Sequence, residues 1–294
     1  MSAKAGITIV GAGNLANALA VSLRRAGYRI DEIIARAAGS SLKKSQKLAK
    51  KIGAGASLVS TAKLDATVVW FCVPDAEIAR AARSLADKVD WTKKIALHSS
   101  GALTSDELDS LGRRGAAVAS VHPLMTFVRG ASFGKSSSGQ SRTSLTGVPF
   151  AIEGDAAAVR VARRIVKDLG GRAYPIRKAE KAAYHTWGTF ASPLLTALLA
   201  TTERVAAIAG VDGRRARQRM IPILLQTLAN YASFGAAGAF SGPIVRGDVD
   251  TVKRHLRVLR KEPAMLEVYL ALARAALLYL PVKNGSDLKK ALRS

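Results

Sequence analysis

The sequence predicts an α/β fold, a doubly wound parallel sheet, followed by an all-α C-terminal domain. The first observation is that apolar strand patterns alternate with helical patterns over residues 7–122, which is typical of parallel strands joined by right-handed helical crossovers. The second is that strand patterns stop near residue 177, after which only helical periodicity remains. We therefore expect two domains, residues 1–177 and 178–294.

The first predicted strand, residues 7–10, leads into a G-x-G-x-x-A turn and a helix over 15–26. Gly11 permits the tight turn, Gly13 permits close approach of a diphosphate, and Ala16 allows the helix to pack against the strand. The helix N-terminus offers free N–H groups to phosphate oxygens. This context predicts a Rossmann-type dinucleotide site; the alternative is a tight turn without a ligand. The expected cofactor-binding residues here are Gly11, Gly13, Asn14, Leu15 and Ala16.

The end of the second predicted strand, residues 28–35, bears on the choice of cofactor. A carboxylate at that point would bind the ribose hydroxyls of NAD, whereas arginine accommodates the 2′-phosphate of NADP. This chain has Arg36 there, and Ser40 opens a basic helix over 40–52. The pattern favours NADP over NAD. The alternative is that Arg36 is a surface charge.

The other elements follow from the same patterns. Residues 66–73 form a continuous apolar run, which is typical of a central parallel strand buried on both faces. Pro193 should kink the longest predicted helix. Further strands are expected at 56–59, 94–97, 116–121, 148–152 and 173–176, and helices at 156–169, 180–209, 214–234, 250–260 and 263–280.

Polar groups follow three predicted strands at their carboxyl ends, where open α/β sheets bind ligands. They lie at residues 73–75, 98–101 and 122. Two histidines at adjacent strand ends favour a catalytic role, although each alone is expected to make structural hydrogen bonds. The expected cofactor contacts are Val73, Pro74, Asp75, Ser99 and Ser100, and the candidate catalytic residues are His98 and His122.

The long predicted helix carries a polar stripe on one face. Lys181 and His185 are four residues apart and share that face, which makes them candidate proton donors. Thr189 and Ser192 continue the stripe and are candidate substrate-binding residues. The alternative is that the stripe bridges to a neighbouring helix.

A second polar group lies in the turn Ser241-Gly-Pro-Ile-Val-Arg-Gly-Asp248. Arg246 is suited to an anionic substrate, and Asp248 either caps the next helix or contacts the same substrate. A capped turn without a ligand would explain the glycines and Asp248 but not Arg246.

Composition excludes several classes of function. The formal net charge is +24, but aromatic residues do not interleave with the basic clusters, so nucleic-acid binding is not expected. The single cysteine, Cys72, excludes a disulfide framework and fits the cytoplasm. The apolar stretch 265–280 is too short and too charged to cross a membrane. Neither a metal site nor a membrane interaction is expected.

With these motifs in hand, the chain resembles a bacterial family with a Rossmann-like N-terminal domain and a helical C-terminal domain of unknown function, whose members are labelled NADP oxidoreductases. The wider superfamily is similar to pyrroline-5-carboxylate reductase and 6-phosphogluconate dehydrogenase. This chain has Ala191-Ser192-Pro193 where the family helix has Ala-Ser-Asn. The motifs that carry the resemblance are the glycine turn at 11–16, Phe71-Cys-Val-Pro-Asp75, His98-Ser-Ser-Gly101, His122-Pro-Leu-Met-Thr-Phe127, Tyr184-His185 and the turn at 241–248.

The resemblance implies a nicotinamide cofactor and a helical domain used for substrate binding and dimerisation. We therefore expect an NADP-dependent oxidoreductase acting on a small carbonyl or imine substrate. Apolar faces at 221–228 and 265–280 favour a homodimer formed by the C-terminal helices. The alternative function is a non-catalytic dinucleotide-binding sensor or interaction module.

Overall fold

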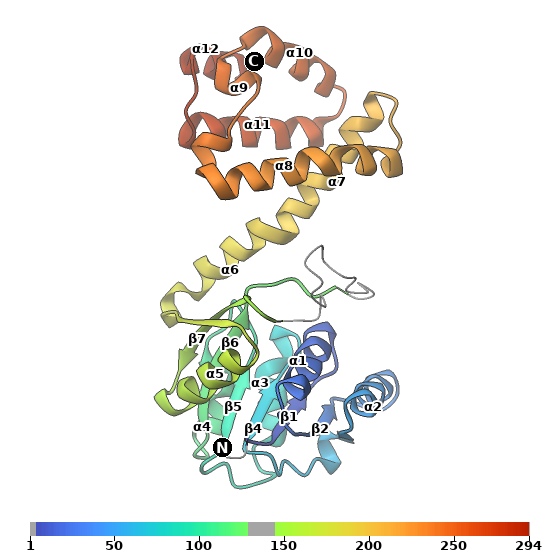
Figure 1. Cartoon of the computed structure of the whole chain (residues 1–294), viewed down its shortest axis with the longest axis vertical. Helices are drawn as coiled ribbons and strands as arrows, with labels where there is room; N and C mark the ends of the chain where they lie inside the picture. The colour runs from blue at the N-terminus through green and yellow to red at the C-terminus, as the bar shows by residue number, and fades with distance from the viewer. Residues whose placement is uncertain (1–3, 129–144, 294) are drawn as a thin grey trace. The chain divides into compact units, whose positions relative to one another are not determined.

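The computed structural model describes residues 4–128 and 145–293. The chain divides into two compact units, Met1–Thr189 and Phe190–Ser294. The first is an α/β unit and the second is helical, which confirms the predicted fold class (Figure 1). The division between the units falls within the predicted long helix, after the point where strand patterns stop.

An eight-stranded sheet in the order β3-β2-β1-β4-β5-β6-β7-β8 organises the first unit. β1 pairs in parallel with both β2 and β4, so the strand order reverses at this point. Ligands bind to open α/β sheets at such a switch point. The strands are β1 Ile7–Val10, β2 Ile30–Ala35, β3 Gly55–Leu58, β4 Val68–Phe71, β5 Ile95–His98, β6 Ala117–Pro123, β7 Pro149–Gly154 and β8 Arg172–Pro175.

One pairing departs from the predicted parallel sheet, because β7 runs antiparallel to β6. An antiparallel neighbour needs no helical crossover, and the described part of the connection, residues 124–128 and 145–148, contains no helix. The pairing sets Glu153 of β7 opposite Ser120 of β6. A buried carboxylate is thereby brought beside the middle of β6.

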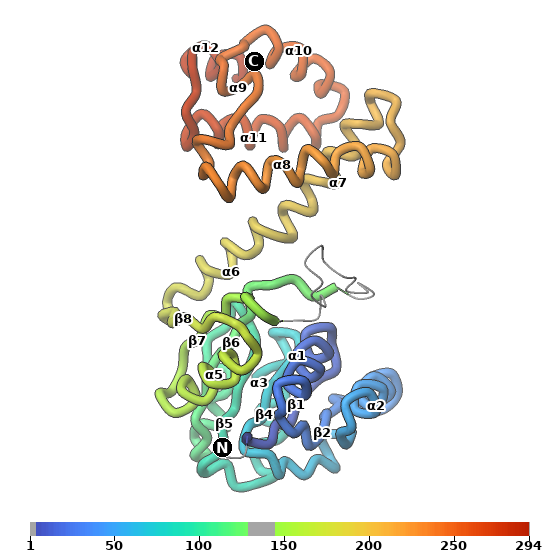
Figure 2. Tube along the Cα trace, in the orientation of Figure 1, coloured from blue at the N-terminus to red at the C-terminus, as the bar shows by residue number. Residues whose placement is uncertain are grey.

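Helices cover both faces of the sheet (Figure 2). Ile9 and Trp70 pack into the cluster under α1 (Asn14–Arg25), α2 (Ser40–Ile52) and α5 (Ala156–Asp168). Val10 and Phe71, their neighbours along the strands, pack on the opposite face under α3 (Asp75–Leu85) and α4 (Asp109–Gly112). This alternation explains why the central strands read as continuous apolar runs.

The long predicted helix changes its geometry around Pro193, which lacks the N–H of a regular helix: the predicted kink position lies in a π-helical segment. A short 3₁₀ turn, Lys178–Glu180, leads into α6 (Lys181–Thr189), and a π-helical segment, Phe190–Leu194, contains the proline. Two further short helices, α9 and α12, were not predicted. The helices of the second unit are α7 Leu195–Ile208, α8 Gly213–Ala239, α9 Pro243–Arg246, α10 Val249–Leu259, α11 Pro263–Tyr279 and α12 Gly285–Ala291.

Large apolar side chains are exposed along α8. The exposed fraction is 67% for Ile223 and 68% for Phe234, and Leu225, Leu228 and Tyr231 are exposed as well. Among the described residues, no single helix is long and apolar enough to cross a membrane, and only the bent pair Lys178–Ile208 and Gly213–Arg246 reaches that length and composition jointly.

Candidate active site

The glycine turn after β1 has the geometry that the sequence predicts. Gly11 adopts φ +105°, and a Cβ placed on it would lie 2.5 Å from the carbonyl oxygen of Cys72. A side chain there would therefore clash with the end of β4. A Cβ on Gly13 meets no atom within 4 Å, so this residue faces open space directly before α1 begins at Asn14. The turn leaves the first N–H groups of α1 accessible to a ligand.

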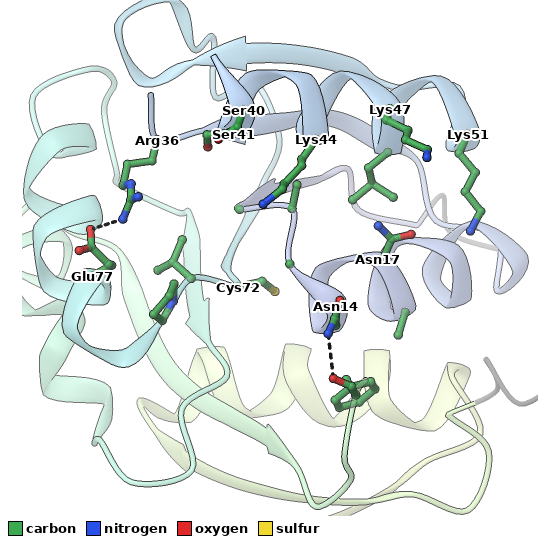
Figure 3. A pocket seen from close by; sticks show the side chains of 18 of the residues that line it. Asn14, Asn17, Arg36, Ser40, Ser41, Lys44, Lys47, Lys51, Cys72 and Glu77 are labelled. Atoms are coloured by element: carbon green, nitrogen blue, oxygen red, sulfur yellow. Dashed lines mark hydrogen bonds and ion pairs between the residues drawn. The ribbon is translucent and has the colours of Figure 1, made fainter. Parts of the chain in front are cut away.

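A cleft of about 670 Å³ extends from this turn (Figure 3). Of the predicted cofactor residues, Gly11, Gly13, Asn14, Arg36, Ser40, Val73 and Pro74 line it. Leu15 and Ala16 instead pack toward the core, and Ala16 is fully buried. The side chain of Asn14 donates a hydrogen bond to the carbonyl oxygen of Phe127 at 3.0 Å. This bond ties the start of α1 to the segment that follows β6.

Three lysines of α2 line the same cleft and were not identified from the sequence. Lys44, Lys47 and Lys51 point toward it from one face of the helix, and Asn17 of α1 lies opposite (Figure 3). Their spacing of three and four residues is the signal that could have identified them. The cleft is therefore strongly cationic.

Glu77 is the one carboxylate among the described residues that line the cleft. It lies 3.3 Å from the guanidinium of Arg36 and also pairs with Arg80. The hydrogen bond from Arg80, together with Arg36, holds the pKa of Glu77 below its ordinary value. Arg36 thus lines the cleft and carries a counter-charge, Glu77, that its place after β2 in the sequence does not reveal.

His98 is fully buried at the end of β5. Its Nδ1 accepts from the backbone N–H of Ser100 at 3.1 Å, and its Nε2 lies 2.9 Å from the carbonyl oxygen of Thr104. Both contacts are satisfied by the neutral ring with its proton on Nε2. Burial, reinforced by the charge of Lys181, lowers the pKa of His98 to about 4. In this arrangement both ring nitrogens are occupied by backbone groups.

Lys181, at the start of α6, is also buried, with 1% of its surface exposed. Its ammonium donates to the carbonyl oxygen of Ser100 at 3.0 Å and to the hydroxyl of Ser120. A carboxylate oxygen of Glu153 lies 3.8 Å away. Burial lowers the pKa of Lys181 to about 8, against the opposing effect of the negative charges of Glu153 and Asp75.

Glu153 was not identified from the sequence. A lone glutamate in a strand gives no local signal, and its burial depends on the antiparallel register of β7. The backbone N–H and the hydroxyl of Ser105 donate to its two carboxylate oxygens at 2.7 and 2.8 Å. Lys181 and Glu153 therefore link α6 to the end of β5, to the middle of β6 and to β7.

His122 and His185 flank Gly101. A Cβ on Gly101 would lie 2.8 Å from Nε2 of His122 and 2.8 Å from Cδ2 of His185, and the two imidazole ring centres are 6.4 Å apart. Nδ1 of His122 is 2.8 Å from the hydroxyl of Tyr184. Burial, then the charge of Lys181, then His185 lower the pKa of His122 to about 4. All four predicted catalytic candidates thus lie around residues 100–101: His98 and Lys181 contact Ser100, and His122 and His185 flank Gly101.

The predicted cofactor residues Asp75, Ser99 and Ser100 make contacts within the protein. Ser100 donates to a carboxylate oxygen of Asp75 at 2.9 Å, and Trp70 donates to the hydroxyl of Ser99 at 2.8 Å. These bonds join the ends of β4 and β5 beside the cleft.

The predicted substrate residues are divided between the two units. In the first unit, the Thr189 hydroxyl donates to the carbonyl oxygen of His185 within α6. Ser192, Arg246 and Asp248 belong to the second unit, where Asp248 accepts from the Thr251 N–H at 3.0 Å and caps α10. Among the residues that the structure describes, no group of three or more His, Cys, Asp or Glu could hold a metal ion.

Two family models match the chain, one over each part. Residues 1–123 match the Rossmann-like domain family. Residues 148–276 match the domain of unknown function DUF2520. No curated protein matches the sequence.

Solved structures share the fold along nearly the whole chain. The "putative NADP oxidoreductase" BF3122 of Bacteroides fragilis is 22% identical with a TM-score of 0.73, over 92% of this chain and 97% of its own. An imine reductase from Pseudomonas sp. is 19% identical with a TM-score of 0.61, over 98% and 99%. A pyrroline-5-carboxylate reductase from Coxiella burnetii is 15% identical with a TM-score of 0.57, over 92% and 97%. At these identities the likeness establishes the fold.

Proposed function

We propose that this chain, in which a Rossmann-like domain precedes a DUF2520 domain, is an NADP-dependent oxidoreductase that reduces a small carbonyl or imine substrate. The observation that carries the proposal is the turn at Gly11, where positive φ and the nearby carbonyl of Cys72 admit no side chain. The turn opens into a cationic cleft. A nicotinamide dinucleotide bound there supplies hydride chemistry.

The residues of the cleft fit such a cofactor. Gly13 and the first N–H groups of α1 would hold the diphosphate. Arg36, Ser40 and Lys44 provide cations and a hydroxyl for the 2′-phosphate of NADP, which supports NADP over NAD. Val73 and Pro74 line the wall toward the ends of β4 and β5.

We assign the proton donor to His185, which lies on the exposed side of α6 next to Gly101. It would protonate the oxygen or nitrogen atom of the substrate's double bond as hydride reaches the carbon. Lys181, the other candidate on this helix, is buried with its ammonium bonded to Ser100 and Ser120. A buried, hydrogen-bonded ammonium is better suited to position the site than to reach a substrate.

His122 has a different part in this proposal. Its low pKa keeps it neutral near pH 7, and the Tyr184 hydroxyl can donate to its Nδ1. The ring proton then resides on Nε2, the atom that faces Gly101. His122 would orient the substrate through a hydrogen bond rather than act as the acid.

We further propose that the chain forms a homodimer through its C-terminal helices. The exposed apolar residues of α8, including Ile223, Leu225 and Phe234, form a surface that water disfavours, and a second copy of the chain would cover it. A monomer by light scattering at micromolar concentration would contradict the dimer.

We place the protein in the cytoplasm, since its single cysteine suits a reducing compartment.

Two measurements distinguish an enzyme from a non-catalytic sensor. NADPH and NADH binding to the pure protein is followed by fluorescence, and a panel of carbonyl and imine compounds is then tested for NADPH oxidation. His185→Ala should lower turnover about a hundredfold with NADPH affinity unchanged. The same substitution at His98, His122 or Lys181 distinguishes the competing donors.

The alternative is a non-catalytic dinucleotide sensor. It would be favoured if NADPH binds, no compound in the panel is reduced, and nucleotide binding changes an interaction with another protein. Absence of nucleotide binding would contradict both functions.

A further inference from the structure

Lys181 carries an ammonium group in the protein interior, an environment that disfavours charge. Its side chain is 1% exposed, and an ammonium ion moved out of water loses its hydration. Two protein oxygens replace part of that hydration, the carbonyl of Ser100 and the hydroxyl of Ser120. Both are neutral, so they satisfy hydrogen bonds without balancing the charge. The balancing charge has to come from a carboxylate.

Glu153 provides that carboxylate. Its Oε1 lies 3.8 Å from the Lys181 nitrogen, and the two side chains are 5% and 1% exposed. The backbone N–H of Ser105 donates to Oε1 and the Ser105 hydroxyl donates to Oε2. Both carboxylate oxygens accept a hydrogen bond from Ser105, which fixes the position of the group in the protein interior.

We propose that Glu153 is a positioning residue of the candidate active site, whose buried carboxylate keeps Lys181 in its ammonium form and thereby fixes the end of β5 beside Gly101. The inference rests on the proposed function, because Gly101 lies between the two imidazoles assigned to the substrate. A neutral Lys181 would still reach Ser100 and Ser120, but its hydrogen bonds would lose the assistance of the charge.

Within residues 4–128 and 145–293, the charged and titratable groups that interact with Lys181 come from four elements. Glu153 of β7 and Asp75 of α3 favour its charged form. His98 of β5 and His122 of β6 have pKa values of about 4 and are uncharged at neutral pH. Replacing Glu153 by glutamine therefore removes the larger of the two charges that favour the ammonium.

The test is an NMR titration of the full chain carrying ¹³C at the lysine Cε positions. The Lys181 signal is assigned by its absence from the Lys181→Met protein. We expect a midpoint near pH 8 in the unchanged chain. In Glu153→Gln the midpoint should fall by about one pH unit or more, a tenfold change in the acid dissociation constant. The amide signal of Gly101 should shift as well.

Asp106→Asn is the matched control. It removes the same charge one residue from Ser105, from an exposed pair with Lys178. The hydrogen bond from Lys178 to Asp106 raises the pKa of Lys178, so this variant should lower the Lys178 midpoint. The Lys181 midpoint and the Gly101 amide signal should stay unchanged.

One result would overturn the proposal: a Lys181 midpoint that stays in place in Glu153→Gln. If Glu153→Gln does not fold, Glu153→Asp withdraws the carboxylate by one methylene group, and a smaller downward shift supports the proposal while no shift overturns it. None of these readouts requires turnover. Failure to find a substrate would therefore count against the proposed function and leave the pairing result standing.

Discussion

The guanidinium of Arg36 lies 3.3 Å from a carboxylate oxygen of Glu77, across the adenosine end of the proposed cofactor cleft. Arg36 comes from the end of β2 and Glu77 from the first turn of α3. A 2′-phosphate and the Glu77 carboxylate would therefore compete for the same guanidinium. The proposed preference for NADP therefore depends on Glu77 as well as on Arg36.

Glu77→Gln removes the carboxylate that competes with the 2′-phosphate for Arg36. Because an exposed ion pair contributes little free energy, NADPH binding should strengthen by only roughly threefold. NADH binding should hardly change, since NADH lacks that phosphate. Arg36→Asp should weaken NADPH binding or reverse the preference. Fluorescence titration of both nucleotides measures these effects. Asp87→Asn controls for net charge, because it removes a carboxylate that pairs with Arg114 outside the cleft. Equal affinities of the unchanged chain for NADPH and NADH would contradict the proposed preference for NADP.

The glycines at the turn allow ligand binding to be separated from stability. Gly13→Ala adds a methyl group where no protein atom lies within 4 Å. The fold should tolerate it, with unfolding free energy within about 0.5 kcal/mol of the unchanged chain, while the methyl group blocks the approach of the diphosphate. We expect dinucleotide binding to weaken at least tenfold.

Gly11→Ala is the contrasting variant. Its Cβ would lie 2.5 Å from the Cys72 carbonyl at a positive φ, so both stability and binding should suffer. Urea unfolding and NADPH titration together distinguish the two variants. NADPH affinity that is unchanged in Gly13→Ala would remove the turn from the proposed site.

The sequence predicts this turn well because its signals are local. A strand, two glycines and a helix start lie within ten residues, and each has its conformational reason. The sequence predicts a kink at Pro193 for the same kind of reason, since a proline lacks the N–H that a helix needs, and the structure has a π-helical segment at this position. The cationic face of α2 is also predictable from local spacing, because helical periodicity places Lys44, Lys47 and Lys51 on one face.

The surroundings of Lys181 could not be predicted in this way. Glu153 becomes its partner only because β7 pairs antiparallel with β6, and that register depends on contacts between distant parts of the chain. His98 illustrates the converse. Its position at a strand end indicates catalysis, whereas burial and two backbone contacts occupy its ring. Burial of a polar residue is a property of the packed unit, which a local pattern does not contain.

Because His98 is buried, we expect the free energy of unfolding to decrease in acid. Its pKa is about 4 in the folded chain and about 6.5 when unfolded, so protonation favours the unfolded state. The folded chain should therefore lose stability as the pH falls from about 6.5 to about 4, by about 3 kcal/mol from this residue. His122, with a pKa of about 4 as well, acts in the same direction.

Urea unfolding at pH 7 and pH 4.5 measures this effect in the first unit, because Trp70, Trp91 and Trp187 all belong to that unit and report it by fluorescence. His98→Asn should be less stable at pH 7 but lose less stability on acidification. His255→Asn, in the second unit, should leave the fluorescence-detected acid loss unchanged. An acid loss that is the same in His98→Asn and in the unchanged chain would contradict the prediction.

Gly101 provides the most direct test of where the substrate lies. A methyl group on this residue would come within 2.8 Å of both His122 and His185, a separation that forces the two rings apart. Gly101 does not line the cleft at the glycine turn, so Gly101→Ala should leave NADPH affinity nearly unchanged. Its turnover should fall about a hundredfold, because displacement of the donor by about an ångström is enough for such a loss. Thr186→Ser, a mild change on the same helix as His185 at a hydroxyl that bonds to the Ala182 carbonyl, is the control. Turnover in Gly101→Ala equal to that of the unchanged chain would place the reacting group away from the two histidines.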